Sequence, residues 1–101
     1  MNERPIPEAA LRDKDAVEML RVWIAGGKLH CSMKVGMYKE TMNLPEEKAW
    51  GIILADVARH LAHAMSIGYS VDEKLTLRGV EESFIKELGL PTSSIDGDIL
   101  E

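Results

Sequence analysis

The strongest constraint on the fold is the pair Gly26-Gly27, which separates two runs with many apolar residues, EMLRVWIA and KLHCSMKV. Adjacent glycines readily take the positive φ values that a two-residue hairpin turn requires. If these two residues form the loop, counting outward pairs Ala25 with Lys28 and, at the far end, Leu20 with Met33. The sequence therefore predicts a β-hairpin over about residues 17–35.

Alternation along the two strands sorts this hairpin into two faces, because successive strand residues point to opposite sides. One face is wholly apolar and holds Leu20, Val22, Ile24, Leu29, Cys31 and Met33. The other is mostly polar apart from its tryptophan and holds Arg21, Trp23, Ala25, Lys28, His30 and Ser32. A slip of one residue would mix these sets, so the pattern predicts a single register.

Two helices are predicted after the hairpin, over about residues 45–67 and 71–88. The first carries an apolar stripe at helical spacing, made of Trp50, Ile53, Leu54, Val57, Leu61, Ala64 and Met65. The stripe of the second is made of Leu77, Val80, Phe84 and Leu88. We expect an α+β fold in which the hairpin packs on two antiparallel helices.

Residues that favour helix starts stand before both helices. Asn43 with Glu46 three residues later forms one predicted capping box, and Ser70 with Glu73 forms the other. Gly68 is expected to end the first helix.

The chain has 101 residues, which suits one domain, expected over residues 1–91, followed by a flexible acidic tail over residues 92–101. At the other end, Pro5-Ile6-Pro7 predicts an extended entry. A short helical turn is expected after it in Pro7–Arg12, and then a turn at Asp13-Lys14-Asp15.

Charge and cysteine content narrow the class of protein. A net charge of −5 argues against a nucleic-acid-binding protein and against contact with anionic membranes. The single cysteine allows no intramolecular disulfide, and no secretory leader precedes the first predicted element. We therefore expect an acidic protein of the cytoplasm.

The hairpin edges suggest a partner. A two-stranded hairpin is marginal alone, and two helices that cover one face leave both strand edges open. A homodimer that joins two hairpins edge to edge would pair these groups and would also cover Trp23. The alternative is a monomer in which the N-terminal segment covers one edge.

The first predicted helix holds the only candidate metal ligands at a regular spacing. Asp56, His60 and His63 lie at i, i+4 and i+7, and carboxylate and imidazole groups suit zinc and similar divalent ions. A metal-binding protein or a metal-dependent hydrolase is therefore one hypothesis. The simpler interpretation, which we favour, is a solvated helix face on which Asp56 pairs with Arg59 or His60.

A second candidate site lies on the polar face of the hairpin. Trp23, His30 and Arg21 could contact a ligand there, with the indole as a stacking surface, or could form part of a subunit interface. Cys31 lies on the opposite strand face from His30, so the two cannot form a nucleophile and base pair within one strand, and we expect Cys31 to be a core residue.

The stretch PIPEAALRDKDAVEMLRVWIAGG and the helix AWGIILADVARH together resemble the DUF5076 family of small bacterial domains of unknown function. The resemblance covers about residues 5–88, and the connector KVGMYKETMNLPEEK is its weakest part. It implies no activity, ligand or catalytic residue.

These observations together predict a small, non-catalytic homodimer without a cofactor, which serves as an interaction or small-ligand-binding module. The partner is a protein or a small molecule of unknown kind, and the metal-dependent hypothesis is the alternative.

Overall fold

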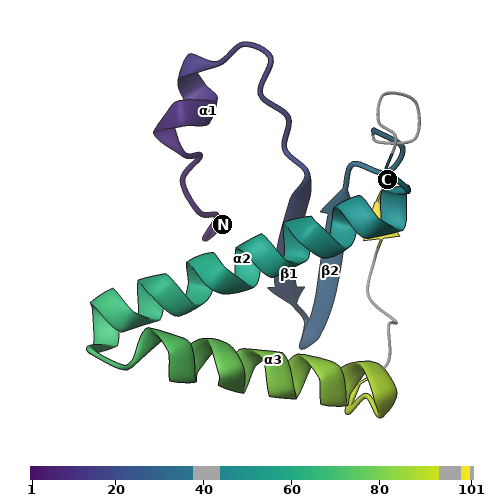
Figure 1. Ribbon diagram of the computed structural model, residues 1–101. Helices are drawn as coiled ribbons and strands as arrows, with labels where there is room; N and C mark the ends of the chain where they lie inside the picture. The colour runs from purple at the N-terminus through teal and green to yellow at the C-terminus, as the bar shows by residue number, and fades with distance from the viewer. Residues whose placement is uncertain (38–43, 94–98, 101) are drawn as a thin grey trace. The chain divides into compact units, whose positions relative to one another are not determined.

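The computed structural model describes residues 1–37, 44–93 and 99–100 of the chain (Figure 1). By its contacts the chain divides into two compact units, Met1–Val35 with Asp96–Glu101 and Gly36–Ile95. Each unit is described by itself below. Together they contain a hairpin and helices, which confirms the α+β class.

The first unit is built on the predicted hairpin, with strands β1 (Leu20–Ala25) and β2 (Lys28–Met33). All six residue pairs have the predicted register, from Ala25↔Lys28 to Leu20↔Met33. Gly26 and Gly27 have φ values of 60° and 74°, the left-handed values that a two-residue turn of this kind needs. Local turn chemistry and strand alternation are sufficient to define the register here.

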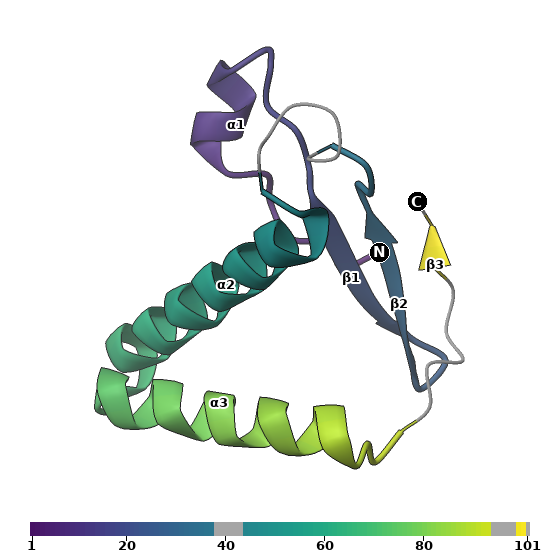
Figure 2. The ribbon, with the colours of Figure 1, turned by 45° about the vertical axis from the view of Figure 1, so that its right-hand side comes forward.

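A third strand, β3 (Ile99–Leu100), pairs with β2 in parallel through Cys31↔Ile99 and Ser32↔Leu100 (Figure 2). The sequence did not indicate this short strand. The sheet order is β1-β2-β3, so β1 is an edge strand among the described residues. A short helix, α1 (Glu8–Arg12), precedes β1 in the same unit and agrees with the helical turn predicted there.

The apolar face of the hairpin is largely open. Val22, Ile24 and Leu29 expose 48%, 71% and 53% of their surface, and Cys31 is half-buried. The pattern of alternation is correct, but the hairpin unit does not bury its apolar face within itself.

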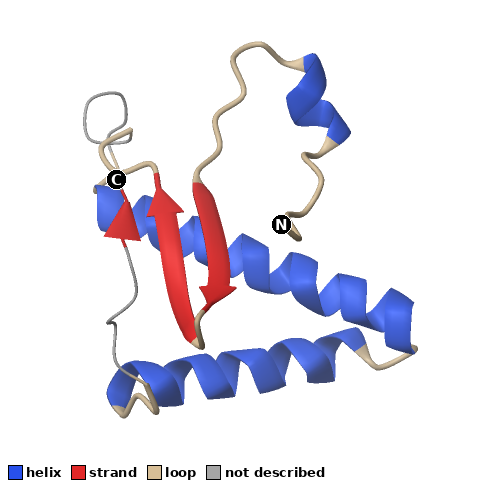
Figure 3. Cartoon of the chain, turned by 180° about the vertical axis from the view of Figure 1, so that it is seen from behind, coloured by secondary structure: helices blue, strands red, loops and turns tan. Residues whose placement is uncertain are grey.

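The second unit is a helical hairpin of α2 (Glu46–Tyr69) and α3 (Glu73–Gly89), drawn in blue in Figure 3. The chain reverses at residues 70–72, so the two helices run antiparallel, as expected (Figure 1). At the start of α2 the N-cap is Pro45, and the Glu46 carboxylate accepts a 2.6 Å hydrogen bond from the backbone N–H of Gly36. The predicted cap Asn43 lies outside the described residues.

The predicted capping box of Ser70 and Glu73 is wrong. Ser70 has φ 56° and ψ 39°, so it ends α2 in the left-handed conformation instead of starting α3. Asp72 is the N-cap of α3, and its Oδ1 accepts a 2.8 Å hydrogen bond from the N–H of Leu75. Both residues favour caps, and the three-residue connection allows only the one nearer to α3 to serve it.

Little of the helical unit is buried. Among the described residues only Ala49 and Ala62 are buried, and both belong to α2. Leu54, Val57 and Leu61 of the α2 stripe remain 39%, 51% and 47% exposed. Packing of the hairpin on the helices, the single domain over residues 1–91 and the flexible tail stay predictions.

None of the helices in the described ranges combines the length and the hydrophobicity that crossing a membrane would require.

Candidate functional site

The hairpin unit contains a cavity of about 450 Å³ between the N-terminal segment and β1. Small-molecule sites commonly measure about 300–1,000 Å³, so the cavity has the size of a ligand site. Its lining residues are Asn2, Glu3, Arg4, Pro5, Ile6, Pro7, Ala10, Val17, Glu18, Leu20, Arg21, Val22 and Trp23. The cavity is therefore formed by one continuous part of the chain.

The outer wall of this cavity follows from the N-terminal sequence. Proline at positions 5 and 7 restricts the entry to extended backbone, and the carbonyl of Pro7 then accepts hydrogen bonds from Ala10 and Leu11 at 3.0 and 3.2 Å to start α1. The predicted turn comes next, where Asp13 Oδ1 accepts from the N–H of Asp15 at 2.9 Å. This turn leads the chain back toward β1, so that the segment and the strand face the same cavity.

Trp23 supplies the aromatic surface of the cavity and is half-buried. Its cross-strand partner is His30, as the register predicted. His30 is not among the lining residues, and its Nε2 lies 3.1 Å from the carbonyl oxygen of Ala25. A carbonyl can only accept, so Nε2 carries the proton in this hydrogen bond. The structure thus brings Trp23 and Arg21 to one cavity and directs His30 to the hairpin backbone.

Arg21 is held by two carboxylates of its own unit. Its Nε and Nη2 donate to Glu18 at 2.8 and 3.0 Å, and its Nη1 lies 3.6 Å from Glu3 Oε2. The hydrogen bond to Glu18, and then the charge of Glu18, raise the pKa of Arg21. The same hydrogen bond lowers the pKa of Glu18. The guanidinium charge is compensated locally, so it offers little attraction to an anionic ligand.

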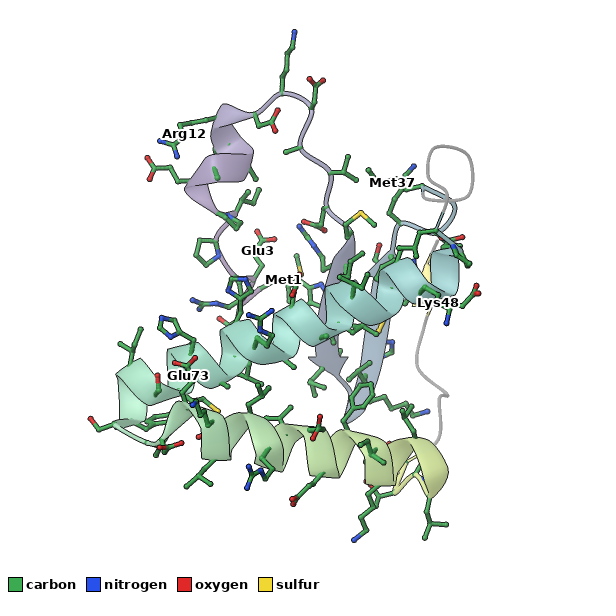
Figure 4. All side chains as sticks on the ribbon, viewed as in Figure 1. Met1, Glu3, Arg12, Met37, Lys48 and Glu73 are labelled. Atoms are coloured by element: carbon green, nitrogen blue, oxygen red, sulfur yellow. The ribbon has the colours of Figure 1, made fainter. Side chains whose placement is uncertain are left out.

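Two of the three candidate metal ligands on α2, Asp56 and His63, have local partners. Asp56 Oδ1 lies 3.5 Å from Arg59 Nη1, as the solvated-face interpretation predicts. His63 Nδ1 lies 2.8 Å from Glu73 Oε1, and the labelled Glu73 stands at the start of α3 in Figure 4. His60 is exposed. Within residues 1–37, 44–93 and 99–100, no three His, Cys, Asp or Glu side chains gather as metal ligands would, and the metal hypothesis stays a prediction.

The side chains around the cavity lack the usual nucleophiles. The lining residues include no Ser, Thr, Cys, Lys or His, so the carboxylates of Glu3 and Glu18 are the groups there that could accept a proton. Its ionisable groups are Glu3, Arg4, Glu18 and Arg21, of which three form the ion pairs described above.

Sequence reasoning identified Trp23 and Arg21 but not the residues opposite them. The N-terminal wall was visible only as two prolines and an apolar Ile6 and Val17. Apolar residues at no regular spacing in a segment without a long helix or strand are a weak signal of a binding wall. Their role becomes apparent only when the segment folds back along β1.

Comparison with known proteins gives a family and a structural relative. A family model named DUF5076, described as a domain of unknown function, matches residues 3–92. A solved chain described as "a putative pyruvate dehydrogenase from the photosynthetic bacterium Rhodopseudomonas palustrus CGA009" is 29% identical with a TM-score of 0.63. The match covers 93% of this chain and 90% of that one. No curated protein matches the sequence.

Proposed function

The chain belongs to the DUF5076 family of domains of unknown function, and for this member we propose the role of a non-catalytic, homodimeric interaction module of the cytoplasm. The observation that carries the proposal is the exposed apolar face of the hairpin. Val22, Ile24 and Leu29 lie on one side of a sheet at 48%, 71% and 53% exposure. Contiguous apolar strand residues of this kind usually mark a binding surface.

The edge of β1 supports pairing with a second copy. Because the turn has two residues, Ala25↔Lys28 is a hydrogen-bonded pair, and the pairs alternate from there. The 2.9 Å bond from the N–H of Lys34 to the carbonyl of Met19 fits this alternation. The N–H and C=O of Val22 therefore point away from β2, toward the edge of β1 with which no described strand pairs. Two such edges can pair antiparallel about a two-fold axis.

The alternation of inward- and outward-pointing backbone groups along β1 also provides a selective test of edge pairing. Val22→Pro removes one outward N–H without removing a bond to β2. Val22→Thr is the matched control, because it keeps the N–H and the branched shape. We expect light scattering after size exclusion to give a dimer for the wild type and Val22→Thr, and a dissociation constant at least about 10-fold higher for Val22→Pro. Circular dichroism would check that each variant is folded. A wild-type monomer at every concentration would refute the proposal.

A second candidate role, binding of a small ligand, is favoured by the cavity beside Trp23. Since Arg21 is neutralised by Glu18 and Glu3, the chemistry favours an uncharged, flat or aliphatic molecule over an anion. Indole is a suitable probe, with amide-resolved NMR as the readout. Shifts confined to residues 2–23 that vanish in Trp23→Ala would support this role. Shifts spread over the chain, or none, would contradict it. The name printed for the relative from Rhodopseudomonas belongs to that protein and is not extended to this chain.

A further inference from the structure

The residues of α2 include a second, narrower apolar pattern within the broad stripe. Starting at Trp50, apolar or small residues follow in alternating steps of four and three. We call these six positions the α2 seam: Trp50, Leu54, Val57, Leu61, Ala64 and Gly68. Alternating steps of four and three are the spacing by which one helix packs against another along its length. A second helix is therefore one partner that this spacing suits.

The other helix of the same unit does not cover the seam. The fully buried Ala62 lies one residue beyond Leu61, about 100° around the helix. Met65, which follows Ala62 by about one helical turn, lines a shallow groove with Val80 and Phe84 of α3. Leu54, Val57 and Leu61 remain between 39% and 51% exposed. Thus α3 packs on one side of α2 and leaves Leu54, Val57 and Leu61 of the seam exposed, whereas Trp50 is half-buried.

We propose that the α2 seam packs antiparallel against the α2 seam of a second copy of the chain. This inference rests on the proposed homodimer and names a helix face through which two copies would associate. In an antiparallel pair of helices, each a position of one helix packs in a layer with a d position of the other. Here Leu54, Leu61 and Gly68 are a positions, and Trp50, Val57 and Ala64 are d positions. The resulting layers pair Trp50 with the partner's Gly68, Leu54 with the partner's Ala64, and Val57 with the partner's Leu61. Each layer occurs twice about the two-fold axis.

Side-chain size favours this arrangement over a parallel one. The largest seam residue, Trp50, meets the smallest, Gly68, and Leu54 meets Ala64, so each layer has a similar total volume. A parallel pair would place two tryptophans in one layer and two glycines in another, and protein interiors tolerate neither crowding nor voids. A Cβ atom added at Gly68 would meet no atom within 4 Å, so nothing in the chain occupies the space directly beside this glycine.

The orientation can be read from mixed disulfides. In a Cys31→Ser background, Val57→Cys and Leu61→Cys proteins would be combined in equal amounts, equilibrated, oxidised and separated by mass. The proposed layers bring position 57 of one copy to position 61 of the other. We expect the mixed disulfide to exceed either symmetric disulfide by at least about 10-fold, since a disulfide needs Cα atoms within about 7 Å. Ile52→Cys, on the opposite side of α2, is the matched control and should form no excess of any disulfide.

Oligomeric state separates failure of this inference from failure of the proposed function. A dimer by light scattering that yields mainly symmetric disulfides, or none, would overturn the antiparallel seam and leave the homodimer standing. A monomer at all concentrations would overturn both.

The dissociation constant of the dimer provides a second measurement. Leu61→Glu should raise it about 100-fold or more, because the substitution places a charge in an apolar contact. Ile52→Glu should leave it unchanged. If Leu61→Glu is unfolded, the disulfide experiment still decides.

Discussion

His63 and Glu73 join the two helices of the second unit at their connection. Nδ1 of His63 in α2 lies 2.8 Å from Oε1 of Glu73 in the first turn of α3, and the same carboxylate oxygen accepts from Ser66 Oγ at 3.3 Å. Asp72, one residue earlier, caps α3 through the N–H of Leu75. The turn between the helices is therefore held by side chains of both helices, although the residues around it are exposed.

The Glu73 contact predicts a dependence of stability on acid pH. The hydrogen bond from His63 lowers the pKa of Glu73 below its ordinary 4.5. A carboxyl group with a lowered folded-state pKa contributes stability above the unfolded value, and this contribution is lost as the pH falls through the folded value. We expect the thermal midpoint to fall less steeply below about pH 4.5 in Glu73→Gln than in the wild type. Glu81→Gln, a change at another exposed glutamate of α3, is the control. Identical pH profiles for all three proteins would show that the contact does not contribute.

The cap of α3 predicts opposite effects at two neighbouring positions. Asp72→Ala should lower the free energy of unfolding by about 1 kcal/mol, because the N–H of Leu75 loses its acceptor. Ser70→Gly should be neutral or stabilising by up to about 1 kcal/mol, because Ser70 has a φ of 56° that glycine adopts without strain. Urea denaturation measures both. A loss on Ser70→Gly together with no change on Asp72→Ala would restore Ser70 as the cap.

The hairpin turn predicts a ranking of substitutions at Gly26. Its φ of 60° is accessible to asparagine but costly for a branched residue. We expect Gly26→Asn to stay within about 0.5 kcal/mol of the wild type and Gly26→Val to lose about 1–2 kcal/mol. Urea denaturation gives the stabilities, and amide NMR shows whether the register is kept. Equal stability of the two variants would mean that the turn does not define the hairpin.

Removal of metal tests the alternative hypothesis for α2. Because Asp56 pairs with Arg59 and His63 pairs with Glu73, we expect a chelator to leave the thermal midpoint unchanged. Added zinc should likewise have the same effect on the wild type and on His60→Ala. Stoichiometric metal in chelator-free preparations, lost on His60→Ala, would instead establish the metal-binding hypothesis. Elemental analysis of both proteins provides the measurement.

The register of the hairpin shows how much local sequence can specify. Gly26-Gly27 defines the loop, and from it the count places Trp23 opposite His30 without any further information. The helix bounds were also close, with α2 observed at Glu46–Tyr69 against a prediction of 45–67. In both cases the determining interactions lie within a few residues of each other along the chain. The spacing of apolar residues along the sequence reflects such short-range interactions directly.

Other features depended on contacts between separate elements. The sequence predicted one capping box of Ser70 and Glu73. In the structure Ser70 instead ends α2, and the Glu73 carboxylate contacts His63, ten residues away. The sequence marked Trp23 as a candidate contact residue, but only the folded N-terminal segment, with Ile6 and Val17, gives that indole a cavity. Turn chemistry and alternation are properties of neighbouring residues, so the sequence by itself determined the hairpin and the helices. Which side chains meet across elements depends on how the chain folds back, and this only the tertiary structure decided.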